Sequence, residues 1–195
     1  MRQSVLYFSA ALAAAIIASP SARAELVVNP GFEADDASSG PVLSPTGWTA
    51  TGNAGVDNVY PNSGNNDGFI GTGSLSQVIA TVPGTVYTVS FYAAVTDPTL
   101  ASDGAATFDA LFDGIDLIGG PIAAGNLFPG YQPQFIAQVS VLDSSSTLEF
   151  DGFTTGGGET FYIDDVSVTP VPEPASLLLL APALAGLRLA RRRTA

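Results

Sequence analysis

Short segments that alternate apolar and polar residues recur through the middle of the chain. β-branched and aromatic residues fill these segments, as in 86–92 and 161–168, and such residues favour strands. Pro-Gly, Asp-Pro, Asp-Gly and Gly-Gly pairs separate the segments, and each of these pairs favours a turn. No helical period of useful length occurs outside the two chain ends. The pattern therefore predicts an all-β fold, an antiparallel β-sandwich or barrel.

The expected strands are residues 75–79, 86–92, 108–112, 135–141, 147–150 and 161–168. Asp113-Gly114 between apolar neighbours predicts a tight hairpin, because this dipeptide accepts the positive φ angles that such turns need. The stretch 53–68 is rich in Asn, Gly and Asp. Its low apolar content predicts loops, with one short strand around 56–60.

The start of the chain has the pattern of a secretory signal peptide. Arg2 precedes an apolar run over 5–18, and Ala22-Arg23-Ala24 matches a small-residue cleavage site. We therefore expect residues 1–24 to form a signal helix that is removed on export, with a mature start at Glu25. The alternative is an N-terminal helix that is not cleaved.

The end of the chain combines a short motif, an apolar run and a basic cluster. Pro172, Glu173 and Pro174 precede the run 175–187, and Arg188, Arg191, Arg192 and Arg193 follow it. Arginines stay on the cytoplasmic side of a bilayer, so this order predicts a hydrophobic anchor helix with the Pro-Glu-Pro motif at the outer surface. A full span needs about 20 residues, and Pro182 interrupts the run. An ordinary tail anchor and a buried C-terminal helix are the alternatives.

This composite tail resembles the PEP-CTERM sorting signal of Gram-negative, exopolysaccharide-producing bacteria. The resemblance implies that an exosortase-type membrane enzyme processes the motif and that the tail occupies the inner membrane during sorting. It also implies delivery to the cell surface or extracellular matrix. We therefore expect three parts: a signal peptide over 1–24, a β-sandwich domain over 25–170, and a sorting and anchor segment over 171–195.

The expected domain 25–170 contains no Lys, Arg, His or Cys, while it holds 17 acidic residues, all of those in the chain except Glu173. Nothing in it neutralises phosphate, so nucleic acid and anionic lipid are poor partners for this domain. It also lacks a base for a nucleophilic triad, and we expect no enzyme. A small glycoside-acting enzyme would need two carboxylates in an apolar cleft. Some carboxylates would be satisfied by a cation or by backbone N–H groups, and most by solvent.

Segments at both ends of this domain resemble galactose-binding-like jelly rolls, which include carbohydrate-binding modules. The opening segment is 28–33, followed by Gly47-Trp48, and the closing segment is 161–168. The resemblance implies a jelly-roll sandwich in which the first and last strands lie together. It also implies a structural calcium that uses Glu33 and Asp164, with Asp165 as a helper.

The residues themselves leave this metal site open. Along an extended strand Asp164 and Asp165 point to opposite faces, so one carboxylate lies in a site where an unpaired charge is costly. A hard cation or several N–H donors would satisfy it. The alternative is that both side chains lie at the rim of the sandwich and are hydrated.

Sugar recognition would use aromatic side chains in loops, and the candidates for ligand binding are Tyr60 and Tyr131. Trp48 is expected in the core, because large aromatic residues of small sandwiches are mostly buried. Two functions follow. The first is an exported cell-surface or matrix protein, associated with biofilm or exopolysaccharide, whose sandwich is a structural or adhesive unit. The alternative is a carbohydrate-binding module that recognises an extracellular polysaccharide.

Overall fold

The computed structural model describes residues 24–95, 106–127, 131–154 and 159–172. The described residues up to Val171 belong to one compact unit. Ala22, the expected signal helix, Glu173, Pro174, the four arginines of the tail and the expected anchor helix lie outside the described residues. Within the described part of the chain, no helix is long and apolar enough to cross a membrane.

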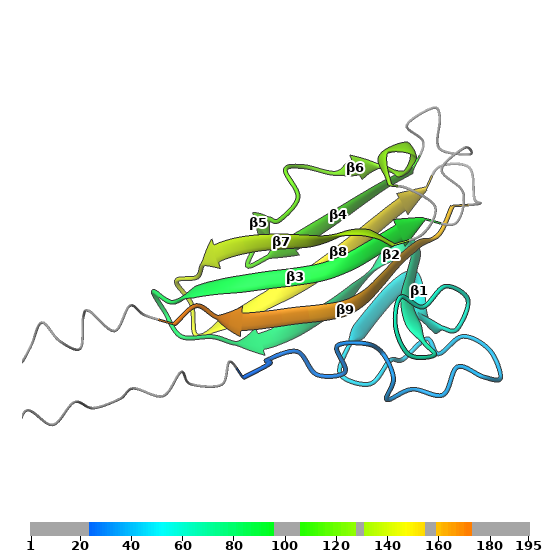
Figure 1. Ribbon diagram of the computed structural model, residues 1–195, viewed down its shortest axis with the longest axis horizontal. Coiled ribbons are helices and arrows are strands. Elements are labelled where there is room, and N and C mark those ends of the chain that lie inside the picture. Colours follow the sequence, from blue (N-terminus) through cyan, green and yellow to red (C-terminus); the bar gives the residue numbers. More distant parts are fainter. Residues whose placement is uncertain (1–23, 96–105, 128–130, 155–158, 173–195) are drawn as a thin grey trace, which may run out of the picture. The chain divides into compact units, whose positions relative to one another are not determined.

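Nine strands and one short 3-10 helix make up the unit (Figure 1). They are β1 Thr49–Asp57, β2 Asp67–Ala80, β3 Val86–Val95, β4 Ala106–Phe112, β5 Ile115–Asp116, β6 Ile122–Ala123, η1 Ala124–Asn126, β7 Gln132–Ser140, β8 Ser145–Thr154 and β9 Phe161–Pro170. Every strand pairing is antiparallel. The order is β5-β4-β8-β2-β9-β3-β7, with β1 on β2 and β6 on β4. The all-β antiparallel prediction is confirmed.

The long strand β2 joins two layers of the sandwich. Its first half pairs with β9, through Gly68–Ile70, and its second half pairs with β8, from Gly73 to Ala80. The layer β9-β3-β7 and the layer β8-β4 therefore share one strand (Figure 1). A register shift in β1 lies opposite this transition. At Gly52, where φ is +64°, a Cβ would come within 2.4 Å of the Thr72 carbonyl oxygen, so only glycine permits the close crossing.

The core lies between the two layers. Phe91 of β3 contacts Phe150 of β8 edge to face, with ring centroids 4.9 Å apart. Phe108 of β4 contacts Phe161 of β9 at 5.6 Å. All four rings are at most 1% exposed. Aromatic pairs of this kind stabilise a fold beyond the area they bury, and no disulfide is needed to hold the two layers together.

The opening motif closes one end of this core. Phe32 is fully buried and contacts Trp48, with ring centroids 5.3 Å apart. The indole N–H of Trp48 donates to the Asn29 carbonyl oxygen at 3.1 Å. Trp48 is 6% exposed, so its expected place in the core is confirmed. The Asn29 side chain in turn bonds the Ala34 N–H and the Asp35 carboxylate, which fixes the loop.

The predicted Asp113-Gly114 hairpin is confirmed, because β4 and β5 pair across it and both residues have positive φ. The prediction for 53–68 is wrong in its boundaries. Strand β1 continues to Asp57 and β2 begins at Asp67, so the loop is only 58–66. Glycine and asparagine occupy these strands because the backbones approach closely there, and close approach leaves no signal in the apolar pattern.

Candidate functional site

A second aromatic cluster lies apart from the core, on the outer face of the layer β2-β9-β3. Successive residues of a strand point to opposite faces. Because Ile70 and Ile163 belong to the core, Phe69 and Tyr162 face outward. These two residues are register partners on β2 and β9. Gly55 of β1 is the register partner of Phe69, and a Cβ at this position would lie 2.9 Å from the Phe69 ring. Glycine at position 55 therefore leaves room for the ring.

The two tyrosines that the sequence nominated for ligand binding meet at this cluster. Tyr60 comes from the β1–β2 loop and Tyr131 immediately precedes β7. Their ring centroids are 6.1 Å apart, and Tyr60 lies 5.6 Å from Tyr162. Tyr60 and Tyr131 are half-buried, whereas Tyr162 is 4% exposed. Three tyrosine rings from distant segments therefore form a platform that reaches the surface.

The loop 58–66 is folded back onto this face by carboxylates. Each of its bonded backbone N–H groups donates to an acidic side chain: Val59 to Asp57, Tyr60 to Asp67, Asn62 and Ser63 to Asp164, and Asn65 and Asn66 to Glu33. The donor–acceptor distances are between 2.8 and 3.1 Å. Bonds from N–H groups to carboxylates are among the stronger hydrogen bonds. In a domain without basic side chains, the backbone of one loop supplies the donors.

The expectation that Asp164 and Asp165 point to opposite faces is wrong. Both side chains bind the same loop: Asp164 accepts from the Asn62 and Ser63 N–H groups, and Asp165 accepts from the Asn62 amide and Ser63 hydroxyl. The reason is a bulge, since the β3–β9 register shifts here and Asp165 has φ of +50°. A bulge re-aims side chains that a regular strand would separate.

The structure brings the three expected calcium ligands around one glycine. A Cβ at Gly31 would lie 3.5 Å from Asp164 Oδ1, 3.8 Å from Asp165 Oδ1 and 4.0 Å from Glu33 Cγ. These carboxylates, however, already accept from N–H and O–H donors, and Asp164 Oδ1 accepts from the Asp165 N–H at 2.7 Å. Among the described residues, no three acidic, His or Cys side chains converge in a way that could hold a metal ion. Calcium at this position therefore stays a prediction from the sequence.

Asp164 itself is fully buried. Burial raises its pKa to about 6, although the N–H groups of Ser63, Asp165 and Asn62 act in the opposite direction by stabilising the carboxylate.

Asp57 and Asp67 form a carboxyl pair beside the tyrosines. They are register partners at the loop end of β1 and β2, and Asp67 is fully buried. Burial raises the pKa of Asp67 to about 9, and the hydrogen-bonded Asp57 side chain and the nearby charge of Asp164 add to the shift. Two carboxylates in contact cannot both ionise easily. Contact with Asp57 therefore favours the protonated form of Asp67.

Two buried oxygens at this position have no hydrogen-bond partner among the described residues: Asp67 Oδ1 and Tyr131 Oη. If Asp67 is protonated, its carboxyl group can donate a hydrogen bond to the Asp57 carboxylate. The Tyr131 hydroxyl has no hydrogen-bond partner of this kind in the described part of the chain. Its burial raises its pKa, and the charges of Asp67, Asp164 and Asp57 raise it further. Burial also raises the pKa of Tyr162 to about 12, and the charges of Asp57 and Asp67 add to the shift.

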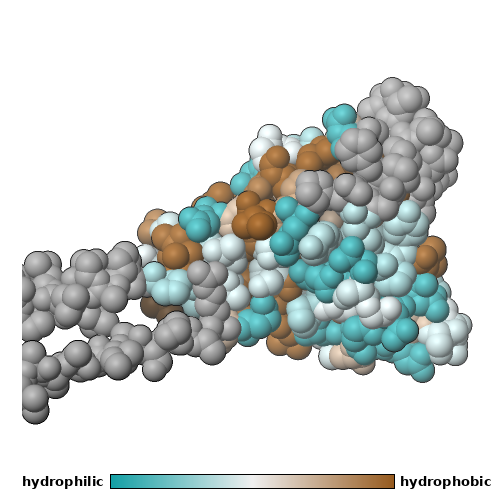
Figure 2. Space-filling model, viewed as in Figure 1, coloured by the Kyte–Doolittle hydropathy of each residue, from teal (hydrophilic) through white to brown (hydrophobic). Residues whose placement is uncertain are grey.

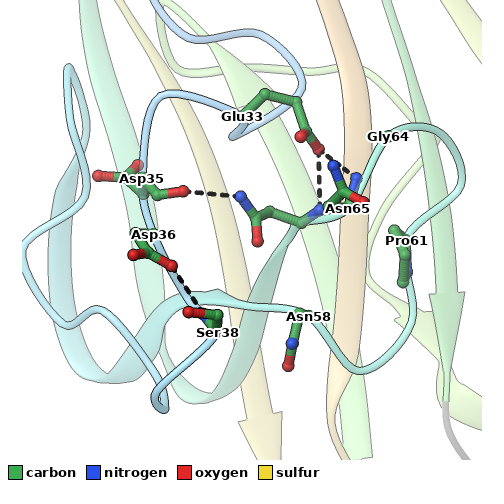
Figure 3. A pocket seen from close by; sticks show the side chains of 9 residues that line it. Glu33, Asp35, Asp36, Ser38, Asn58, Pro61, Gly64 and Asn65 are labelled. Atoms are coloured by element: carbon green, nitrogen blue, oxygen red, sulfur yellow. Dashed lines mark hydrogen bonds between the residues drawn. The ribbon is translucent and has the colours of Figure 1, made fainter.

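A polar hollow of about 620 Å³ lies between the loop 58–66 and the segment 33–38 (Figure 3). It is lined by Glu33, Asp35, Asp36, Ser38, Asn58, Pro61, Gly64, Asn65 and Asn66. The Asp36 carboxylate accepts from the Ser38 N–H, and the Asn66 side chain donates to the Asp35 carbonyl oxygen. Amide and carboxylate groups without any cation line this hollow, which suits hydroxyl-rich or positively charged ligands.

Sequence reasoning did not single out Asp57, Asp67 or Tyr162. The signal that could have found them is the alternation of β2 and β9, which places Asp67 and Phe69 on one face and Tyr162 and Asp164 on one face. Their meeting also requires the β2–β9 pairing, which the sequence does not specify. In Figure 2, hydrophilic residues gather over the loop end of the domain, and hydrophobic residues appear along the strands.

No protein-family model matches the chain, and a search of curated proteins gives no significant match. Solved structures do match. The Stig cyclase Fisc from Fischerella sp. TAU, in complex with a 3H-indole compound, is 16% identical and has a TM-score of 0.52, with 78% of this chain and 100% of that chain covered. The arabinose-bound α-L-arabinofuranosidase MgGH51 is 17% identical with a TM-score of 0.53, over 76% of this chain and 26% of that chain.

A carbohydrate-binding module, TmCBM61 in complex with β-1,4-galactotriose, also matches. Its TM-score is 0.48 at 16% identity, with 76% of this chain and 99% of that chain covered. At these identities the matches establish the fold alone, an all-β antiparallel sandwich, and nothing about ligand or activity.

Proposed function

We propose that the protein is an exported cell-surface or matrix protein whose sandwich binds a carbohydrate. The observation that carries the proposal is the meeting of Tyr60, Tyr131 and Tyr162 on the outer face of the β2-β9-β3 layer. Sugar rings present apolar faces that stack on aromatic side chains, and their hydroxyls need polar partners.

The surroundings of the rings supply those partners. The loop 58–66 carries Tyr60 and also lines the hollow through Asn58 and Asn65. Hydrogen bonds to four carboxylates hold this loop in place. A loop that is fixed before binding loses little entropy when the ligand arrives.

A glycoside-acting enzyme is less well supported. Catalysis by inversion or retention needs two carboxyl groups about 5 to 9 Å apart. Asp57 and Asp67, register partners at the loop end of β1 and β2, are instead in direct contact. The match to the cyclase shows a shared fold only, and it identifies no catalytic residue in this chain.

The decisive experiment is a glycan array probed with the purified full-length protein, with calcium and with chelator. We expect binding to a defined set of glycans that Tyr60→Ala weakens. The absence of binding in both conditions would overturn the carbohydrate proposal.

A second candidate is a structural or adhesive unit, which strand β7 favours. β7 is the last strand in the sheet order and pairs with β3 alone among the described strands. Its residues 132–140 carry no charge in an otherwise acidic domain, and Ile136 is 66% exposed. Uncharged edge strands can pair with another chain. A monomer by analytical ultracentrifugation at high concentration would count against this role.

Delivery rests on the two terminal segments. We propose secretion with cleavage before Glu25, processing at Pro172-Glu173-Pro174 by an exosortase-type enzyme, and transient retention in the inner membrane through the arginine cluster. The chemistry of the segments, an apolar run followed by arginines, supports this order of events.

A further inference from the structure

Strand β7 leaves the backbone groups of its outer edge without a partner strand. Just beyond its end, the Val141 N–H donates to the Thr85 carbonyl oxygen, and the Val141 carbonyl oxygen accepts from the Gly84 N–H. Alternate residues of an antiparallel strand turn both backbone groups toward the same neighbour. Residues 139, 137 and 135 therefore bond to β3, as Val141 does. The N–H and C=O groups of residues 134, 136 and 138 turn to the free edge, where no described strand meets them.

The side chains along this edge are uncharged and read the same in both directions. Gln134, Ile136 and Gln138 are all exposed, and Ile136 lies between the two glutamines with 66% of its surface exposed. A second copy that runs antiparallel about Ile136 places Ile136 against Ile136 and Gln134 against Gln138. Apolar pairs stabilise neighbouring strands, and facing amides can bond to each other. The edge is therefore complementary to itself.

Charge decides which edge of the sheet a second copy can approach. The domain 25–170 holds 17 acidic residues and no basic ones, so two copies repel each other over most of their surfaces. Neither β7 nor its neighbour β3 contains a charged residue. The sheet order ends on its other side in β5, which has only two residues, one of them Asp116. Short strands and charges prevent pairing at an edge, and β7 has neither.

The start of β7 limits the length of the open edge. Pro133 has no N–H to donate, and the β3–β7 register shifts beside it, between the partners of Phe91 and Ala93. Proline and bulges both interrupt pairing. The open edge is therefore the segment 134–140, and the contact that it can make is short. Such a contact needs the high local concentration that display on a surface provides.

We propose that β7 pairs with β7 of a second copy of this chain, antiparallel, about a twofold axis at Ile136. The two Ile136 backbones exchange both of their hydrogen bonds, and the layers β9-β3-β7 of the two copies become one continuous sheet. Because the same patch serves both copies, the contact closes as a dimer. This inference rests on the second candidate function, the structural or adhesive unit, and names its partner.

An introduced thiol reports the register, because the chain contains no cysteine. Facing residues of a hydrogen-bonded pair have Cα atoms about 5.5 Å apart, which a disulfide can bridge. Full-length Ile136→Cys in detergent is oxidised, and the dimer is measured on a non-reducing gel. Gln138→Cys is the matched control on the same strand and face, since its two copies lie about 14 Å apart along the paired strands. We expect a disulfide dimer from Ile136→Cys and its loss in Gln138→Cys.

A mixture of two variants tests the same register from the other side. Gln134→Cys and Gln138→Cys should each stay monomeric alone and form a disulfide dimer when mixed, because residue 134 of one copy faces residue 138 of the other. Crosslinking within each variant alone, to the same extent as in the mixture, would contradict the twofold axis at Ile136.

Sedimentation at increasing protein concentration tests the contact without a thiol. Ile136→Lys sets two positive charges against each other at the axis, so the dimer should be lost. Val78→Lys is the control, because it adds the same charge at a residue that is 69% exposed on β2, a strand inside the sheet. Val78→Lys should associate as wild type does, and unchanged melting temperatures would show that both variants fold.

Equal crosslinking of Ile136→Cys and Gln138→Cys, or association that survives Ile136→Lys, would overturn the β7 contact and leave a structural unit that assembles through another surface. A wild-type protein that stays monomeric and an Ile136→Cys variant that forms no disulfide would overturn both the contact and the structural candidate. Glycan binding by Ile136→Lys tests the carbohydrate proposal independently of either result.

Discussion

Asp57 and Asp67 face each other as register partners at the loop end of β1 and β2, with their carboxyl groups in hydrogen-bond contact. The contact forms part of a wider arrangement in which acidic side chains hold the loop 58–66 on the outer face of the sheet. Asp57 accepts from the Val59 N–H and Asp67 from the Tyr60 N–H. Asp67 therefore positions the loop residue whose ring contacts Tyr131 and Tyr162.

The first prediction concerns the pH dependence of stability. The folded-state pKa of Asp67, about 9, lies above the ordinary value of 3.8 for this side chain. The raised pKa of Asp67 contributes its full stabilisation only below about pH 4, where the side chain is protonated in both the folded and the unfolded state. This contribution falls as pH rises toward 9, because Asp67 loses its proton at a lower pH in the unfolded chain than in the folded protein. Asp67→Asn should therefore gain unfolding free energy relative to wild type between pH 5 and pH 8, by up to about 1 kcal/mol per pH unit. Urea unfolding of both proteins at about pH 5 and about pH 8 measures this difference in unfolding free energy.

Asp113→Asn is the matched control for this series, because it removes a carboxyl group in the β4–β5 turn, away from the pair. The difference in unfolding free energy between Asp113→Asn and wild type should change less with pH than that of Asp67→Asn. Parallel pH profiles for wild type and Asp67→Asn would show that Asp67 ionises normally in the folded state.

The second prediction concerns the anchor of the loop. In Asp164→Asn, an NH₂ group can replace an oxygen that accepts from backbone N–H groups, and the variant loses the buried charge-assisted bonds. We expect a loss of about 2 to 3 kcal/mol in unfolding free energy. Asp165→Asn should lose less than about 1 kcal/mol, since its partners are exposed side chains.

The same variants test the calcium prediction. A calcium site at Glu33, Asp164 and Asp165 would raise the melting temperature of wild type when calcium is added, and Asp164→Asn would remove this rise. An Asp164→Asn loss that is equal with calcium and with chelator would instead show that the N–H donors alone satisfy the carboxylate.

The third prediction locates the sugar-binding face. Tyr60→Ala removes the ring that contacts both Tyr131 and Tyr162, and we expect glycan affinity to fall about tenfold. Phe153→Ala is the control, because Phe153 is a 54% exposed aromatic residue on β8 of the other layer. Equal losses in the two variants, measured by calorimetry, would place the binding face elsewhere.

The fourth prediction concerns sorting. Glu173→Gln should block processing of the tail and leave the protein in the membrane fraction, because the apolar run and the arginines are intact. Neutral residues at Arg191, Arg192 and Arg193 should instead impair membrane retention. Immunoblots of membrane and medium fractions measure both effects. Normal processing of Glu173→Gln would contradict the sorting motif.

Much of the architecture followed from local patterns. Alternation in 86–92 and 161–168 predicted strands that are present as β3 and β9, and Asp113-Gly114 predicted a hairpin that forms. These predictions succeeded because side-chain direction in a strand and the positive φ of a tight turn depend on neighbouring residues alone. The boundary at 53–68 was wrong because close packing of β1 on β2 favours glycine over apolar residues there.

The sequence by itself determined that the domain 25–170 contains no basic side chain, so its buried carboxylates had to find a cation or backbone donors. Only the tertiary structure decided that the donors are the N–H groups of loop 58–66, and that a bulge at Asp165 turns two neighbouring aspartates toward that loop. It also decided that Tyr60, Tyr131 and Tyr162 meet. The physical reason is that pairing between β2 and β9, distant in sequence, is set by the packing of the whole sandwich rather than by any local pattern.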